Sequence, residues 1–186
     1  METISSYKRK IRILSRNNEN TAFMNADNEK ALAVFVELFH RAQQRVRLFS
    51  GSLLNEEVSN NSQYISALSD FLEKEGVKLE ILLNKPDEEK MRNTPLYKRL
   101  SYYKNAGTDI TIRKTDRKLY FLKSEQVRTE CHFCVCDNNS FRLEIDIVNR
   151  SAICNFNDTT GASVLIKKFD DMFNDSEEIC FSDTNS

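Results

Sequence analysis

Apolar residues recur at helical spacing in four stretches of the chain. They lie three or four positions apart in residues 26–44, 62–76, 94–107 and 160–173, which predicts four helices. Each stretch also carries end signals, which place its boundaries. The candidates for the start of a helix are Asp27 or Asn28, Thr94 followed by Pro95, and Asp158 or Thr159. The candidates for the end of a helix are Gly76 and Gly107.

Strand patterns lie between and after these helices. The segments RVRLFSGSLL, VKLEILLN and TDITIRK alternate with the helices, and TECHFCVCD, FRLEIDIV and SAICNFN follow one another with short turns between them. Alternating helices and strands favour parallel neighbours, whereas consecutive strands with short turns favour antiparallel pairing. We therefore expect an α/β fold with one mixed sheet that is flanked by helices on both faces.

The flanking segments are more polar than this central region. Residues 1–24 are basic and then rich in Asn, so we expect an N-terminal arm in which KIRIL could form a short strand and the following residues a loop. Residues 25–175 make up a single predicted domain, and residues 176–186 a frayed polar tail. Within the domain, residues 115–126 read as a loop with some helix.

Composition limits the classes of protein that this chain can belong to. Of its 186 residues 40% are hydrophobic, enough for one core, and the formal net charge is -1, which argues against a dedicated nucleic-acid coat. No segment is apolar enough for a membrane span or a secretory signal. Five cysteines without framework spacing favour free thiols in a reducing cytoplasm. The composition also suggests an A/T-rich bacterial or phage genome.

The segment CHFCVCDNN, residues 131–139, holds the most conspicuous side chains for chemistry. In a strand, His132, Cys134 and Cys136 share one face, and three ligands in a line do not surround a tetrahedral metal ion. A nucleophilic thiolate needs an electropositive and partly open setting, which a buried strand does not provide. We therefore expect no metal and no cofactor here, and cysteines that act as small apolar residues.

The order of these segments resembles a single phospholipase D-like domain from about Arg45 to Phe173. RVRLFSGSL is similar to the first strand of that family, YISALSDFLEKEGVKLEILLN and YKRLSYYKNAGTDITIRK to its next two units, and FNDTTGASVLIKKFDDMF to its closing helix. HFCVCDNN falls where the family carries its histidine motif: His, any residue, Lys, four residues, Asp, then often six residues and Gly-Ser-any-Asn.

The motif itself is incomplete in this chain. His132 agrees with it, but Cys134 stands at the lysine position and Asn139 at the aspartate position. The last positions hold Asp146, Ile147 and Asn149, of which only Asn149 agrees. The resemblance implies a nucleophilic histidine, a second histidine as acid, and lysines that hold the phosphate, with two motif copies per site. Because loss of one such donor costs on the order of 10²- to 10³-fold in rate, we expect His132 to be vestigial.

Three functions remain open on this basis. The first is a non-catalytic phospholipase D-like binding or scaffold module, a homodimer or part of a larger complex; domains of this kind often accompany bacterial or phage defence genes, as the resemblance implies. The second is a divergent, metal-independent phosphodiesterase or nuclease that dimerises through His132 and takes a lysine from elsewhere, such as Lys114 or Lys118. The third is a nucleic-acid-binding protein without catalysis.

Two further groups of residues are candidates for binding. Arg142 and Glu144 would share a face and could line a pocket beside His132, or could form an ion-pair ladder on a solvated face. Basic side chains with interleaved aromatics suit a nucleic-acid strand, and they gather between residues 113 and 123. The nucleic-acid candidates there are Arg113, Lys114, Arg117 and Lys118. The basic N-terminal arm could add to them, or serve as a solubilising tail.

Overall fold

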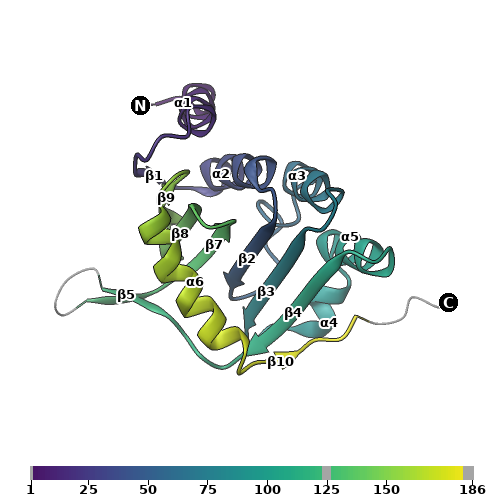
Figure 1. Cartoon of the computed structure of the whole chain (residues 1–186). Coiled ribbons are helices and arrows are strands. Elements are labelled where there is room, and N and C mark those ends of the chain that lie inside the picture. The colour runs from purple at the N-terminus through teal and green to yellow at the C-terminus, as the bar shows by residue number, and fades with distance from the viewer. Residues whose placement is uncertain (1, 123–126, 182–186) are drawn as a thin grey trace.

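Residues 2–122 and 127–181 are described in the computed structural model of the chain, in which helices cover both faces of one large sheet (Figure 1). The helices are α1 (Ile4–Arg16), α2 (Asn28–Arg41), α3 (Ser62–Leu72), α4 (Glu88–Arg92), α5 (Pro95–Asn105) and α6 (Thr159–Phe173). The strands are β1 (Phe23–Asn25), β2 (Arg45–Ser50), β3 (Lys78–Asn84), β4 (Asp109–Thr115), β5 (Tyr120–Leu122), β6 (Arg128–Glu130), β7 (His132–Cys136), β8 (Ser140–Asp146), β9 (Ser151–Asn155) and β10 (Glu177–Glu178).

Within these residues the main sheet has eight strands in the order β1-β9-β8-β7-β2-β3-β4-β10. Strands β2, β3 and β4 run parallel, whereas β7, β8 and β9 pair antiparallel, and β7 joins the two halves by pairing with β2. The edges are formed by β1, with three residues, and β10, with two. The predicted α/β fold with a mixed, helix-flanked sheet is confirmed.

The core lies in two layers, one on each face of the sheet. Helices α2, α3 and α5 lie on one face of the sheet with α1 beside α2, and α6 lies on the other face (Figure 1). The buried side chains of these two groups of helices belong to separate clusters. Residues of β2 alternate between the layers, since Leu48 belongs to the first and Phe49 to the second. Both faces of the central strands are therefore buried, and their sequences read as nearly continuous apolar runs.

Polar side chains at the helix ends explain why the helices begin where they do. Asp27, Asn61, Thr94 and Asp158 each accept a hydrogen bond from a backbone N–H in the first turn of α2, α3, α5 and α6 respectively. Pro95 occupies the first turn of α5, where its missing N–H is not needed. The predicted caps Asp27, Thr94 and Asp158 are confirmed.

The structure corrects the secondary structure predicted for residues 1–24. KIRIL lies inside α1 and forms no strand, because Tyr7, Ile11 and Leu14 recur at helical spacing and are buried. Tyr7 also donates a hydrogen bond from its hydroxyl to the backbone oxygen of Met24 in β1, at 3.3 Å. This region therefore begins with a packed helix and ends with an edge strand, β1, while the domain bounds 25–175 stay a prediction.

Residues 115–126 also differ from the expectation. Where the sequence suggested loop with some helix, Tyr120–Leu122 form β5, which pairs with β6 in a separate two-stranded ribbon; residues 123–126 lie outside the described part. The short helix α4 was not predicted. In the predicted tail, β10 pairs with β4 and Ile179 is buried, and residues 182–186 lie outside the described part. None of the described helices has both the length and the apolarity required to cross a bilayer.

Candidate functional site

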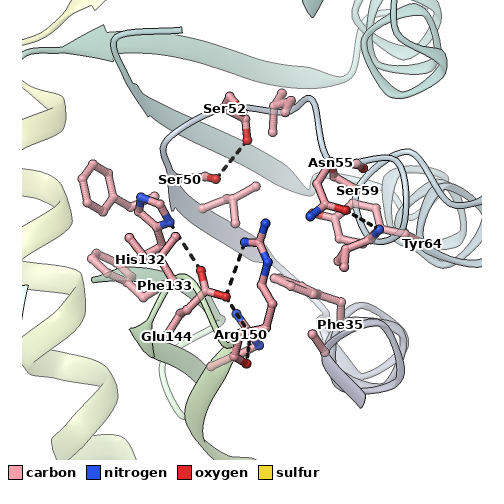
Figure 2. A pocket seen from close by; sticks show the side chains of 17 residues that line it. Phe35, Ser50, Ser52, Asn55, Ser59, Tyr64, His132, Phe133, Glu144 and Arg150 are labelled. Carbon is pink, nitrogen blue, oxygen red and sulfur yellow. Dashed lines mark hydrogen bonds and ion pairs between the residues drawn. The ribbon is translucent and has the colours of Figure 1, made fainter. Parts of the chain in front are cut away.

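His132 opens onto a cavity of about 200 Å³ at the carboxyl end of β2 (Figure 2). Its walls come from the start of α2, the loop after β2, α3, and the adjacent strands β7 and β8. The lining residues are Ala31, Phe35, Leu48, Phe49, Ser50, Ser52, Leu53, Asn55, Val58, Ser59, Tyr64, His132, Phe133, Arg142, Glu144, Ile147 and Arg150. The carboxyl ends of parallel strands are the usual place for ligand sites in α/β folds.

A carboxylate on the neighbouring strand orients the imidazole. His132 and Glu144 are direct partners in the β7–β8 register, and their side chains point toward each other (Figure 2). Nδ1 of His132 lies 3.4 Å from Oε2 of Glu144, whereas Nε2 is buried and has no hydrogen-bond partner among the described residues. The neutral imidazole therefore carries its proton on Nδ1, and Nε2 is left as an acceptor.

Glu144 is the centre of a buried polar network. Its Oε1 accepts a hydrogen bond from Arg142 at 3.1 Å and lies 3.7 Å from Nη1 of Arg150. Arg142 also donates from Nε to Asn25 Oδ1 at 3.1 Å and from Nη2 to the backbone oxygen of Arg150 at 3.2 Å. The amide of Asn25 donates to that same oxygen at 2.9 Å. These bonds tie β1, β8 and the turn before β9 together.

The balance of these contacts sets the charge of Glu144. Burial raises the pKa of its carboxyl group, but the hydrogen bond with His132 and the positive charges of Arg142 and Arg150 outweigh burial and lower the pKa below its usual value. Glu144 is therefore ionised at neutral pH. The cavity wall holds two guanidinium groups against one carboxylate, which makes it suited to an anionic or hydrogen-bond-accepting group.

Aromatic rings and a glycine fix the remaining geometry. The ring of Phe49 packs edge-on against the His132 imidazole at 5.8 Å, and the Arg142 guanidinium stacks over Phe35 at 5.2 Å. A Cβ atom at Gly51 would lie 3.3 Å from Cε1 of His132, so the Ser-Gly-Ser turn approaches the imidazole closely. In that turn Ser50 donates its hydroxyl hydrogen to the backbone oxygen of Ser52 at 3.0 Å.

The cysteines lie in the protein interior. Cys134 is fully buried, and its Sγ lies 3.9 Å from that of Cys136. Burial raises the pKa of Cys131 to about 11 and that of Cys154 to about 12, so these thiols are protonated at neutral pH. No group of three or more His, Cys, Asp or Glu side chains in the described part of the chain is placed to hold a metal ion.

Of the five residues predicted to form a pocket with His132, two line the cavity and three do not. Arg142 and Glu144 line the cavity, but Cys134, Asn139 and Asn149 do not. Asn139 lies in the β7–β8 turn, where it donates a hydrogen bond to Asn157 at 3.3 Å. Asn149 donates to Asp146 at 2.9 Å in the turn before β9.

Sequence reasoning missed two members of the network, Asn25 and Arg150. Asn25 is the first residue of the predicted domain and directly follows a polar segment that was expected to be loop. Arg150 has a φ angle of 54°, a left-handed conformation that is uncommon for arginine, and this turn brings its backbone oxygen to Arg142. The Asn149-Arg150-Ser151 turn between two strand patterns was the available signal for such a conformation.

Each of the predicted nucleic-acid-binding side chains is engaged within the protein. Arg113 donates to the backbone oxygens of Phe173 and Ser176, both at 3.0 Å. Acidic side chains also lie within 4.0 Å of all four residues. The pairs are Arg113–Glu178, Lys114–Glu88, Lys114–Glu177, Arg117–Asp175 and Lys118–Glu130.

Solved structures with this arrangement of strands and helices include proteins of the phospholipase D family. Nuc from Salmonella typhimurium, a phospholipase D family member, superposes with a TM-score of 0.58 at 13% identity, over 88% of this chain and 100% of Nuc. NucT from Helicobacter pylori superposes with a TM-score of 0.51 at 11% identity, over 86% of this chain and 99% of NucT.

A third similar structure is that of TrmBL2, an archaeal chromatin protein that shows a novel mode of DNA binding. It has a TM-score of 0.59 at 14% identity over 94% of this chain, and the match spans only 62% of TrmBL2. No family model and no curated protein matches the sequence. The order of elements, the histidine at the start of β7 and these superpositions agree, and the chain has the fold of phospholipase D family proteins.

Proposed function

We propose that this chain is a phospholipase D-like binding module that does not hydrolyse phosphodiesters. The observation that carries the proposal is the residue beside His132 on the same face of β7. The family motif has a lysine there, whereas this chain has Cys134, which is fully buried and lies against Cys136. A cysteine side chain carries no positive charge, so it cannot replace the lysine that holds the non-bridging oxygens of a phosphate as negative charge develops on them.

The other cations near His132 do not replace that lysine. Arg142 and Arg150 line the cavity, but both lie against the Glu144 carboxylate, and Arg142 is also bonded to Asn25. Lys114 and Lys118, the lysines that a divergent enzyme could recruit, are paired with acidic residues: Lys114 with Glu88 and Glu177, and Lys118 with Glu130. Loss of one donor costs on the order of 10²- to 10³-fold in rate, and a site built from two copies would suffer that loss twice.

A divergent phosphodiesterase is the second candidate, and the His132–Glu144 pair favours it. The carboxylate holds the imidazole by Nδ1, which leaves Nε2 without a partner in the cavity, as a histidine nucleophile requires. One histidine cannot act as both nucleophile and acid, so this function requires two chains. A homodimer and membership of a defence complex remain predictions.

The activity of purified protein distinguishes the two candidates. Bis(4-nitrophenyl) phosphate and end-labelled single- and double-stranded DNA are incubated with the wild type, His132→Ala and His40→Ala in EDTA. His40 is the chain's other histidine; it lies in α2 near Asp70, away from the cavity, and is the matched control. We expect no hydrolysis above background by any of the three. Hydrolysis that His132→Ala abolishes and His40→Ala retains would establish the enzyme and overturn the binding-only proposal.

A further inference from the structure

Helix α1 carries a concentrated positive charge. It holds five of the chain's 27 Lys and Arg residues and none of its 28 Asp and Glu residues, so the other residues together have a net charge of -6. Its length of 13 residues corresponds to roughly 20 Å at 1.5 Å per residue, or about one cation every 4 Å. Such asymmetry of charge within a chain is typical of a surface that binds a polyanion.

The cations of α1 form a row on its outer side. Lys8, Arg12 and Arg16 are spaced four residues apart, with Arg9 beside them, and residues at this spacing lie on one face of a helix. The opposite face, with Tyr7, Ile11 and Leu14, is buried. The helix lies beside α2 at the outside of the fold (Figure 1), where Arg9, Arg12 and Arg16 are exposed and Lys8 is half-buried, while the apolar face holds the helix in place.

Four of these five cations lack partners in the part of the chain that the structure describes. Among the described residues, Lys8, Arg9, Lys10 and Arg16 make no ion pair or side-chain hydrogen bond, and of the five only Arg12 has a carboxylate nearby, Glu37 at 3.4 Å. The basic residues of β4 and the segment after it differ in this respect, because each of Arg113, Lys114, Arg117 and Lys118 has an acidic neighbour. The positive charge of α1 is therefore available to an external anion.

The buried apolar face distinguishes a nucleic acid from a membrane. A helix that lies in a bilayer interface inserts its apolar face into the lipid, but in α1 Tyr7 is 2% exposed and Ile11 1% exposed. Only Ile13, at 48%, is an exposed large apolar residue on this helix. What α1 offers is charge alone, and a sugar-phosphate backbone is bound chiefly through charge.

We propose that the basic row of α1 binds the phosphate backbone of a nucleic acid without reading its sequence. No residue of α1 lines the cavity at His132, so this surface is separate from that site and stands whether or not the site is catalytic. Contacts by the four cations of the row predict a slope of about -3.6 in a plot of log K against log salt for a duplex, which weakens binding about 150-fold between 50 and 200 mM salt.

Two matched double variants test the proposal, because the chain contains the tripeptide Tyr-Lys-Arg twice. Lys8→Glu/Arg9→Glu changes α1, and Lys98→Glu/Arg99→Glu makes the same change in α5, where the tyrosine is likewise buried and Lys98 and Arg99 are exposed. Fluorescence anisotropy with a labelled 20-base-pair duplex and a labelled 20-nucleotide single strand measures the affinity at each salt concentration. We expect the α1 variant to bind at least tenfold more weakly at 50 mM salt, with the duplex salt slope reduced by about 2, and the α5 variant to bind as the wild type does.

Other results would overturn the proposal. Absence of wild-type binding at 50 mM salt, an equal loss in both double variants, or a loss confined to the α5 variant would each exclude α1 as the site. So would binding of α1 to vesicles containing phosphatidylserine without binding of either oligonucleotide. Circular dichroism establishes that the variants fold, and Lys8→Gln/Arg9→Gln repeats the test if the charge reversal prevents folding.

Discussion

Arg142 and Glu144 lie two residues apart on β8, and the Arg142 guanidinium donates to the Glu144 carboxylate at 3.1 Å with both side chains almost fully buried. A buried ion pair is stable only when its remaining hydrogen-bonding groups are satisfied. Here His132, Asn25 and the backbone oxygen of Arg150 provide those bonds. The pair therefore contributes both to the cavity wall and to the joining of three strands.

Replacement of Glu144 by glutamine should lower the free energy of unfolding by about 3 kcal/mol, because it leaves the Arg142 charge buried without a counter-charge. Urea denaturation measures the change. The matched control is Glu130→Gln, which removes a carboxylate that pairs with Lys118 at the surface, and it should cost under about 1 kcal/mol. Equal losses in the two variants would contradict the role of the buried network.

The same carboxylate should make stability depend on pH. The pKa of Glu144 is lowered in the folded protein, so its stabilising contribution is complete above the unfolded value of about 4.3 and is lost as the pH falls through the lowered folded value. The difference in unfolding free energy between the wild type and Glu144→Gln isolates this contribution from that of the other acids. It should be present in full at pH 5 and shrink on further acidification; a difference that grows as the pH falls below 5 would contradict the sign.

One thiol of the five should react quickly with Ellman's reagent in the native protein at pH 8. Cys180 is exposed, whereas Cys131, Cys134, Cys136 and Cys154 are buried. Burial also raises the pKa of Cys131, Cys136 and Cys154, which keeps the reactive thiolate scarce. All five should react in guanidinium chloride, and Cys180→Ser should have no fast thiol. A second fast thiol in that variant would show that the cysteine strands are accessible.

Gly161→Ala should destabilise the protein by about 1 to 2 kcal/mol, although alanine is the better helix former by about 1 kcal/mol. A Cβ atom at this position would lie 2.5 Å from Oδ2 of Asp158 and 2.8 Å from the ring of Phe141. The N-terminal cap of α6 and the packing of that helix on β8 would both have to shift. Ser163→Ala, at an exposed position in the same helix, is the control, and thermal denaturation of the two variants should separate them.

Much of the site could be predicted from the alternation of side chains in strands. That period places His132 with the face of β7 that meets Glu144 and Arg142 on β8, and the short turn at residues 137–139 sets the register. The caps of α2, α5 and α6 follow from local sequence for the same reason, since each depends on residues within one turn. The parallel and antiparallel halves of the sheet follow from the lengths of the connections.

Contacts between distant residues could not be predicted in this way. Asn25 reaches Arg142 across 117 positions, and nothing local marks a three-residue strand that pairs with β9. The apolar residues of α1 recur at helical spacing, but they are few, and the sequence does not show that α2 will cover them. The β5–β6 ribbon begins at a segment where aromatic and basic residues mix without a clear period, so neither helix nor strand was favoured.

The short edge strands of the main sheet have a consequence for association. A long exposed edge serves as a template for strand addition by another copy, which leads to fibrils and domain swapping. In the described part of the chain, β1 and β10 present only three and two residues at the two edges. Polymerisation along the hydrogen-bonding direction is thereby disfavoured at both ends of the eight-stranded sheet. Two copies that met at these edges would share few backbone hydrogen bonds, so contacts between side chains would have to supply most of the strength of their pairing.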